Sequence, residues 1–190
     1  MSRWGGRGAA PRKGRGRRRS RRNREGTPAG IVDPEDRPSD VGRLDAALVA
    51  DPSITHVVAV HCETTSGILN PIERIAEITA RHGRRLLIDA MSAFGALPLD
   101  AQRTPFDAVA ASANKCLEGV PGIGFAVIRE TALLAAAGNA PALSLDLHDQ
   151  HVAMRRNGQW RFTPPTHVLA AFHEALRQHE AEGGVEGRGG

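Results

Sequence analysis

Beyond residue 38, apolar residues recur with the spacing of helices and strands in turn. The first periodic set follows Ser39 or Asp40, either of which suits the N-cap of a helix. Its members recur at helical spacing, and the pattern ends near Asp51-Pro52, so a short helix is predicted here. The members of this set are Val41, Leu44, Ala47 and Leu48.

A strand, a helix and a second strand are predicted next. The β-branched run of residues 55–60 fits a buried strand. Asn70-Pro71 then opens a helix whose apolar residues share one face and whose stop is Gly83. Because residues 86–88 form another short apolar run, this segment predicts a right-handed βαβ unit.

The second half of the chain extends the sheet. Residues 106–112 form a third strand and residues 122–128 a fourth, with no room between them for a crossover helix, so the fourth strand must be antiparallel. Residues 132–137 predict a short helix, whereas residues 143–147 and 160–167 are less regular. A last helix runs to residue 182, with a buried stripe of Val168, Leu169, Phe172 and Leu176. The predicted fold class is α/β, with a mostly parallel sheet and helices on both faces.

The first 38 residues differ from the rest in composition. They are rich in Arg, Gly and Pro without apolar periodicity, so we expect a disordered tail. Residues 1–24 hold eleven of the 25 Lys and Arg and none of the 21 Asp and Glu, which leaves the remainder at −7. An acidic body does not support a nucleic-acid-binding domain. The tail itself has three interpretations: an arm for nucleic acid or an acidic partner, a mitochondrial presequence, or the product of a displaced reading frame.

The compartment is indicated by the cysteines and the apolar runs. Cys62 and Cys116 show neither metal-ligand spacing nor a disulfide framework, which suits a reducing cytoplasm. No apolar run approaches the roughly 18 residues of a membrane span, and no hydrophobic signal segment opens the chain. The sequence therefore predicts a cytoplasmic protein without a membrane partner.

Two residues at strand ends are candidates for chemistry. Asp89 ends the second predicted strand and Lys115 follows the third, so both are expected at the edge where parallel strands end and ligands bind. Pyridoxal phosphate requires an amine for a Schiff base and an acid beside its ring nitrogen. The alternative is a surface lysine and a strand-end aspartate without a ligand. Small residues before Lys115 and the Gly/Pro-rich turn after it favour the cofactor, because a ligand can approach the backbone closely there.

Five segments carry a family resemblance. They are HCETTSGILNPI from His61, IDAMSAFGALPLD from Ile88, SANKCLEGVPGIGF from Ser112, SLDLHDQ from Ser144 and WRFTPPTHVLAAFHEAL from Trp160. Together they resemble the 2-aminoethylphosphonate–pyruvate transaminases, which are fold-type I pyridoxal phosphate enzymes related to alanine–glyoxylate aminotransferases. The resemblance implies residues 39–182 as part of the cofactor-binding large domain and residues 183–190 as a truncated linker.

The resemblance assigns roles to single residues. Lys115 would carry pyridoxal 5′-phosphate and move the proton, and Asp89 would hold the pyridinium. Thr64 would contact the ring oxygen, Met91 a ring face and Asn114 the phosphate.

The resemblance also implies a reaction and an assembly. The amino group of 2-aminoethylphosphonate would pass to pyruvate, giving phosphonoacetaldehyde and L-alanine in phosphonate catabolism. The expected assembly is a homodimer, in which Thr163 reaches the phosphate of the partner's cofactor. His148 stands where tyrosine is expected, so no role is implied there.

Two family segments have no counterpart in the sequence: a Gly-Ser-Gly-Thr phosphate loop before residue 36 and a C-terminal domain with a substrate-binding arginine. The resemblance therefore implies a fragment. The alternatives are a related alanine–glyoxylate or serine–pyruvate type aminotransferase, and an inactive remnant with a basic nucleic-acid-binding tail.

Overall fold

The computed structural model describes residues 30–31, 33–34 and 36–189. The predicted disordered tail therefore lies almost entirely outside the described residues. Its last part is attached to the body, because the Asp33 carboxylate pairs with Arg43 at 2.6 Å.

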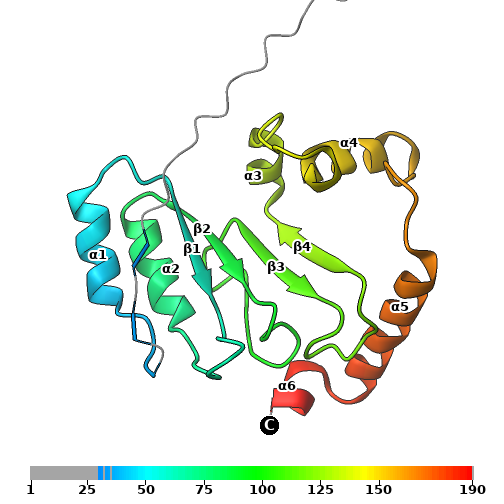
Figure 1. Cartoon of the computed structure of the whole chain (residues 1–190), viewed down its shortest axis with the longest axis horizontal. Coiled ribbons are helices and arrows are strands. Elements are labelled where there is room, and N and C mark those ends of the chain that lie inside the picture. The colour runs from blue at the N-terminus through cyan, green and yellow to red at the C-terminus, as the bar shows by residue number, and fades with distance from the viewer. Residues whose placement is uncertain (1–29, 32, 35, 190) are drawn as a thin grey trace, which may run out of the picture.

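Four strands form one sheet in which spatial order follows chain order (Figure 1). β1 (His56–Val60), β2 (Arg85–Asp89) and β3 (Ala108–Ser112) run parallel, and β4 (Gly124–Ile128) pairs antiparallel with β3. The predicted βαβ unit and the predicted antiparallel fourth strand are both confirmed.

Two helices cover one face of the sheet. α2 (Ile72–Arg81) lies against β1 and β2, and α1 (Val41–Ala50) packs on α2. The Asp40 carboxylate caps α1 by accepting from the N–H groups of Gly42 and Arg43. The apolar stripe of α2 meets the strand residues that alternate toward it, which creates the core. Buried members of this core are Ile72, Ile75, Ala76, Leu86, Ile88, Ala90, Ala93, Phe106 and Val109.

Five further elements follow the sheet. They are α3 (Glu130–Ala135), the 3-10 turn η1 (Leu143–Leu145), α4 (Leu147–Asn157), α5 (Thr166–Ala181) and α6 (Gly184–Gly189). The sequence did not predict α4, because this helix buries no residue and so has no apolar stripe. Its ends carry the signal instead: Asp146 caps it, and Gly158 ends it in the left-handed conformation at φ 70°. The segment predicted as a linker from residue 183 holds α6.

The predicted stripe of α5 needs one correction. Phe172 stacks on Phe125 of β4 with ring centroids 5.2 Å apart, which attaches the helix to the sheet. Ala175 is the buried residue one turn later, and Leu176 is 40% exposed. Positions 168, 172 and 175 share a face at 3.6 residues per turn, and position 176 lies at its flank.

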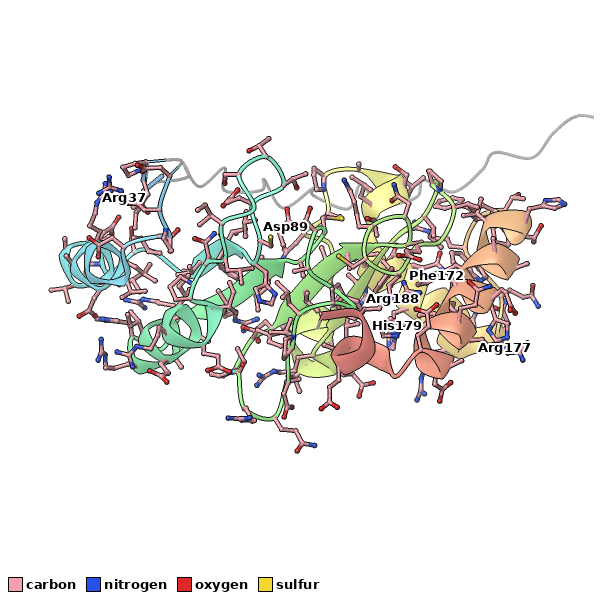
Figure 2. The ribbon with its side chains drawn as sticks, turned by 90° about the horizontal axis from the view of Figure 1, so that it is seen from below. Arg37, Asp89, Phe172, Arg177, His179 and Arg188 are labelled. Carbon is pink, nitrogen blue, oxygen red and sulfur yellow. The ribbon has the colours of Figure 1, made fainter. Side chains whose placement is uncertain are left out.

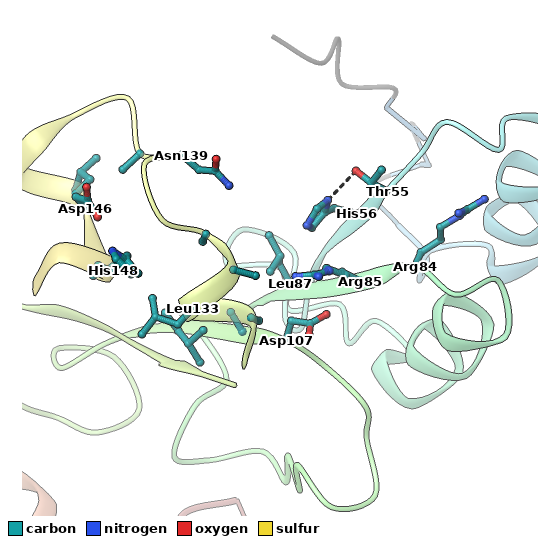
Figure 3. A pocket seen from close by; sticks show the side chains of 18 of the residues that line it. Thr55, His56, Arg84, Arg85, Leu87, Asp107, Leu133, Asn139, Asp146 and His148 are labelled. Carbon is teal, nitrogen blue, oxygen red and sulfur yellow. Dashed lines mark hydrogen bonds between the residues drawn. The ribbon is translucent and has the colours of Figure 1, made fainter. Parts of the chain in front are cut away.

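The second face of the sheet is partly open. Val58 of β1 points to it and is 70% exposed. α3 and α4 lie toward this face and enclose a cavity of about 740 Å³ with the strands (Figure 3). Among the described residues, none of the helices combines the length and apolar character needed to cross a membrane.

Candidate functional site

The carboxyl ends of the three parallel strands lie at one edge of the sheet. Val60 pairs with Asp89, and Asp89 pairs with Ala110, so the strands end nearly level. The loops that follow them, residues 61–71, 90–107 and 113–123, therefore begin side by side. Figure 2 views the molecule from this edge, with Asp89 near its centre.

The Asp89 carboxylate is fixed by the backbone that follows it. Its Oδ1 accepts a hydrogen bond from the Met91 N–H at 2.9 Å. The Asp89 carbonyl also accepts from the His61 N–H at 2.7 Å, which ties β2 to the loop after β1. The bond from Met91 orients the carboxylate and leaves Oδ2 for a ligand.

Lys115 and Asn114 are exposed in the turn after β3. The turn is closed by hydrogen bonds from the Glu118 N–H to the Lys115 carbonyl, 2.8 Å, and from the Gly119 N–H to the Ala113 carbonyl, 2.7 Å. A Cβ at Gly119 would lie 2.9 Å from that carbonyl oxygen, so only glycine fits. The turn thus presents its lysine outward at the same edge as Asp89.

Ser92 joins the three loops, although it was not among the predicted site residues. Its hydroxyl lies 2.6 Å from that of Thr64 in the first loop. Its carbonyl accepts from the Cys116 thiol in the third loop, with sulfur and oxygen 3.5 Å apart. Four of the predicted site residues therefore belong to loops that are hydrogen-bonded to one another, and Asp89 ends the strand before the second loop. The four are Thr64, Met91, Asn114 and Lys115.

Thr163, the sixth predicted site residue, is not brought to this cluster. It is exposed in the segment between α4 and α5, which runs along the outer side of β4 (Figure 1). No hydrogen bond within the described part of the chain joins it to the other five. Its predicted role concerns a partner subunit, which a single chain does not test.

Asn70 anchors the first loop and was also missed as a functional residue. Its amide donates to the Val60 carbonyl and to the Glu63 carboxylate, both at 3.0 Å, and its Oδ1 accepts from the Ser39 N–H. His61 begins the same loop on the covered side of the sheet, and burial lowers the pKa of its imidazole. A buried asparagine has no periodic signature, although its place before Pro71 marks a loop end.

The C-terminal helices hold the other two loops from the covered side. The Arg188 guanidinium of α6 donates to the Cys116 carbonyl at 2.7 Å. The His179 Nε2 lies 2.6 Å from the Gly95 carbonyl oxygen. Figure 2 shows both side chains beside the loop edge. Arg188 also pairs with Glu182 and lowers the pKa of that carboxyl.

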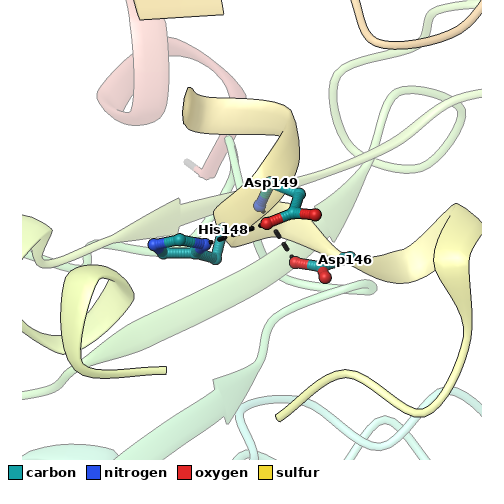
Figure 4. Close-up of side chains that lie close together, drawn as sticks. All are labelled: Asp146, His148 and Asp149. Atoms are coloured by element: carbon teal, nitrogen blue, oxygen red, sulfur yellow. Dashed lines mark hydrogen bonds and ion pairs between the residues drawn. The ribbon is translucent and has the colours of Figure 1, made fainter. Parts of the chain in front are cut away.

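Two other polar regions lie away from this edge. The cavity in Figure 3 is lined by the amino ends of the strands, including His56 and Arg85, at the opposite end of the sheet. Asp146, His148 and Asp149 gather at the start of α4 (Figure 4). Asp146 caps this helix, and Asp149 pairs with Arg161 at 3.1 Å, so helix capping and ion pairing account for the cluster.

The carboxyl edge fits the two demands that pyridoxal 5′-phosphate makes on a protein. An oriented carboxylate and an exposed amine stand at the ends of neighbouring strands, and a hydroxyl loop adjoins both. Such an acid can hold a ring nitrogen protonated, and such an amine can bind an aldehyde.

Comparisons with known proteins agree with this geometry. Over 154 residues, 81% of the chain, it is 60% identical to the 2-aminoethylphosphonate–pyruvate transaminase of Pseudomonas putida (strain W619). It spans only 42% of that relative's length.

Solved structures show the same fold. Pyridoxamine–pyruvate aminotransferase from Mesorhizobium loti superposes with a TM-score of 0.73 at 30% identity, covering 80% of this chain and 40% of the other. Ureidoglycine–glyoxylate aminotransferase from Bacillus subtilis gives 0.68 at 24% identity, with 81% and 40% covered. The sequence profile of Aminotransferase class-V, whose cofactor is pyridoxal 5′-phosphate, matches residues 35–186. The chain therefore belongs to the class-V aminotransferase family.

Proposed function

We propose that this chain contributes the cofactor lysine and its acid partner to a transaminase that moves the amino group of 2-aminoethylphosphonate to pyruvate. The products are phosphonoacetaldehyde and L-alanine. The observation that carries the proposal is the hydrogen-bonded edge at which Asp89 ends β2 and Lys115 lies in the turn after the neighbouring β3. The relatives named for this reaction support the choice of substrates.

Lys115 has two tasks in this proposal. Its amine would hold the cofactor covalently and, when free, would move a proton at the substrate carbon. Pyridoxal phosphate supplies an electron sink that makes this carbon acidic. Asp89, which the Met91 N–H orients, would maintain the sink by keeping the ring nitrogen protonated.

The remaining residues bind and orient. Thr64 donates its hydroxyl to the ring oxygen, Met91 lies against a ring face, and Asn114 contacts the phosphate. Thr163 reaches the phosphate of the cofactor in a second subunit, so the working assembly is a homodimer. We place the enzyme in the cytoplasm, where the free thiols of Cys62 and Cys116 remain reduced.

Covalent capture of the cofactor tests the role of the lysine. The chain contains two lysines, Lys13 and Lys115. Addition of pyridoxal 5′-phosphate should produce a visible absorption band, and borohydride reduction should fix the adduct on the Lys115 peptide, as read by mass spectrometry. Lys115→Ala should abolish both signals, whereas Lys13→Ala, the matched control, should retain them. An adduct on Lys13 alone, or none, contradicts the assignment.

The amino donor is tested on the loaded protein. Addition of 2-aminoethylphosphonate should remove the visible band, and later addition of pyruvate should restore it and release L-alanine. Serine and alanine at the same concentration are the comparison donors. A faster response to either one would favour the alternative serine–pyruvate or alanine–glyoxylate type of activity.

A further inference from the structure

We propose that Ser92 is a positioning residue that sets the direction of the Thr64 hydroxyl and holds the lysine turn. This inference rests on the proposed function, because it concerns how Thr64 meets the cofactor ring. Ser92 lies three residues after Asp89, so one short loop carries both the acid and the residue that organises the other two loops.

The contacts of Ser92 are long-range. The Ser92 and Thr64 hydroxyl oxygens lie 2.6 Å apart across 28 positions of sequence, which is a short hydroxyl–hydroxyl hydrogen bond. Ser92 is half-buried and Thr64 is exposed, so the pair joins the packed loop to the solvent side of the edge. Asn70 and the Met91 N–H fix the two backbones on either side of it.

The number of protons in the Ser92–Thr64 pair decides which hydroxyl donates and which accepts. Each hydroxyl has one proton to donate. For Thr64 to donate to an acceptor oxygen on the cofactor, its proton must be free, and the proton between the two side chains must come from Ser92. Ser92 then donates to Thr64, and Thr64 donates to the ring oxygen. This order also strengthens the outer bond, because hydrogen bonds in a chain polarise one another.

The carbonyl of Ser92 acts separately from its hydroxyl. It accepts from the thiol of Cys116, which directly follows Lys115. Because Ser92→Ala removes the hydroxyl and keeps the carbonyl, it isolates the effect on Thr64. Cys116→Ala removes the hydrogen bond to the Ser92 carbonyl and keeps the Ser92 hydroxyl, so it loosens the lysine turn without changing the contact with Thr64.

The ligand-free chain gives the first test. The amides of Glu63 and Gly67 donate within the first loop, and their hydrogen exchange reports its order. Ser92→Ala should speed this exchange by about twofold to tenfold, the equilibrium effect of one neutral hydrogen bond. Thr64→Ala should do the same, and the double variant should show no further increase. Ser92→Thr should restore the parent rate. Ser66→Ala, a control at an exposed serine of the same loop, should leave it unchanged.

The loaded chain gives the second test. The midpoint of the visible band against pH should move upward in Ser92→Ala, because a Thr64 hydroxyl that Ser92 no longer directs donates less well to the ring oxygen. That oxygen then holds the proton shared with the Lys115 nitrogen more tightly. Ser92→Thr should return the midpoint to the parent value. If the parent chain takes up no cofactor, the proposed function fails and the exchange data alone decide the role of Ser92. Exchange rates or midpoints of Ser92→Ala equal to the parent's would overturn the inference.

Discussion

The two faces of the sheet are built from alternate residues of the same strands, yet they differ sharply in burial. Leu86, Ile88 and Val109 point to the side of α2 and are 1–2% exposed. Their neighbours on the other face include Val58, at 70%, and the half-buried Leu87 and Asp89. The fold is therefore held mainly from one side, and the candidate acid belongs to the side with free surface.

Because the two faces differ in burial, residues that stabilise the fold and residues available for function alternate along each strand. On the covered face every side chain replaces water with close-packed neighbours, and its removal leaves a cavity. On the open face the same residue types lose less contact with water, so the sheet tolerates a polar group such as Asp89 there. The test of this comparison is to make the same change on both faces.

The largest effect is expected from adjacent leucines of β2. Leu86→Ala should lower the free energy of unfolding by about 2–5 kcal/mol, because the removed atoms leave a cavity under α2. Leu87→Ala, its matched control on the open face, should lower it by about 1 kcal/mol or less. Urea titration followed by circular dichroism measures both. Equal losses would mean that the two faces contribute alike and would contradict the comparison.

The covered face was predictable from the sequence because its buried residues recur at regular spacing along the strands and α2. The apolar run of β2 and the stripe of α2 predicted both elements, and the short link before β4 predicted its direction. The helices α4 and α6 left no such trace, since neither buries a residue. Their ends are set by capping and by contacts such as that of Arg188 with the Cys116 carbonyl, which depend on the tertiary fold.

The second comparison uses two glycines with positive φ, one in a packed place and one in an open place. A Cβ at Gly95, φ 97°, would lie 2.6 Å from Cδ2 of Leu117, which is 1% exposed and follows Lys115 by two residues. A Cβ at Gly67, φ 69°, would meet nothing within 4 Å. Both Ala variants carry backbone strain of about 1–2 kcal/mol, and Gly95→Ala should lose about 1–3 kcal/mol more through overpacking.

Thermal unfolding of the two glycine variants separates these contributions. Gly95→Ala should also change the rate at which Cys116 reacts with a thiol reagent, because Leu117 cannot move without the lysine turn. Gly67→Ala should leave that rate at the parent value. If the two variants unfold at the same temperature, the Leu117 side chain moves aside without cost and the turn is not tightly packed.

The candidate site was only partly predictable for the same reason. Asp89 and Lys115 were found because they follow apolar runs, and strand ends in a parallel sheet share an edge. Ser92 and Asn70 have no such marker. Their importance comes from hydrogen bonds to residues in other segments, and pairing between distant polar side chains leaves no pattern in a single sequence.

The smallest expected effect is the loss of stability at acidic pH that burial of His61 causes. Burial lowers the pKa of its imidazole below the ordinary 6.5. Below pH 6.5 the unfolded chain therefore binds a proton that the folded chain resists, so stability is full above this pH and falls as the pH decreases from it. Between pH 8 and pH 5.5 the melting temperature of the parent should therefore fall further than that of His61→Gln. Calorimetry across this range measures the difference, and parallel curves for parent and variant would show that His61 takes up its proton without opening the covered side of the sheet.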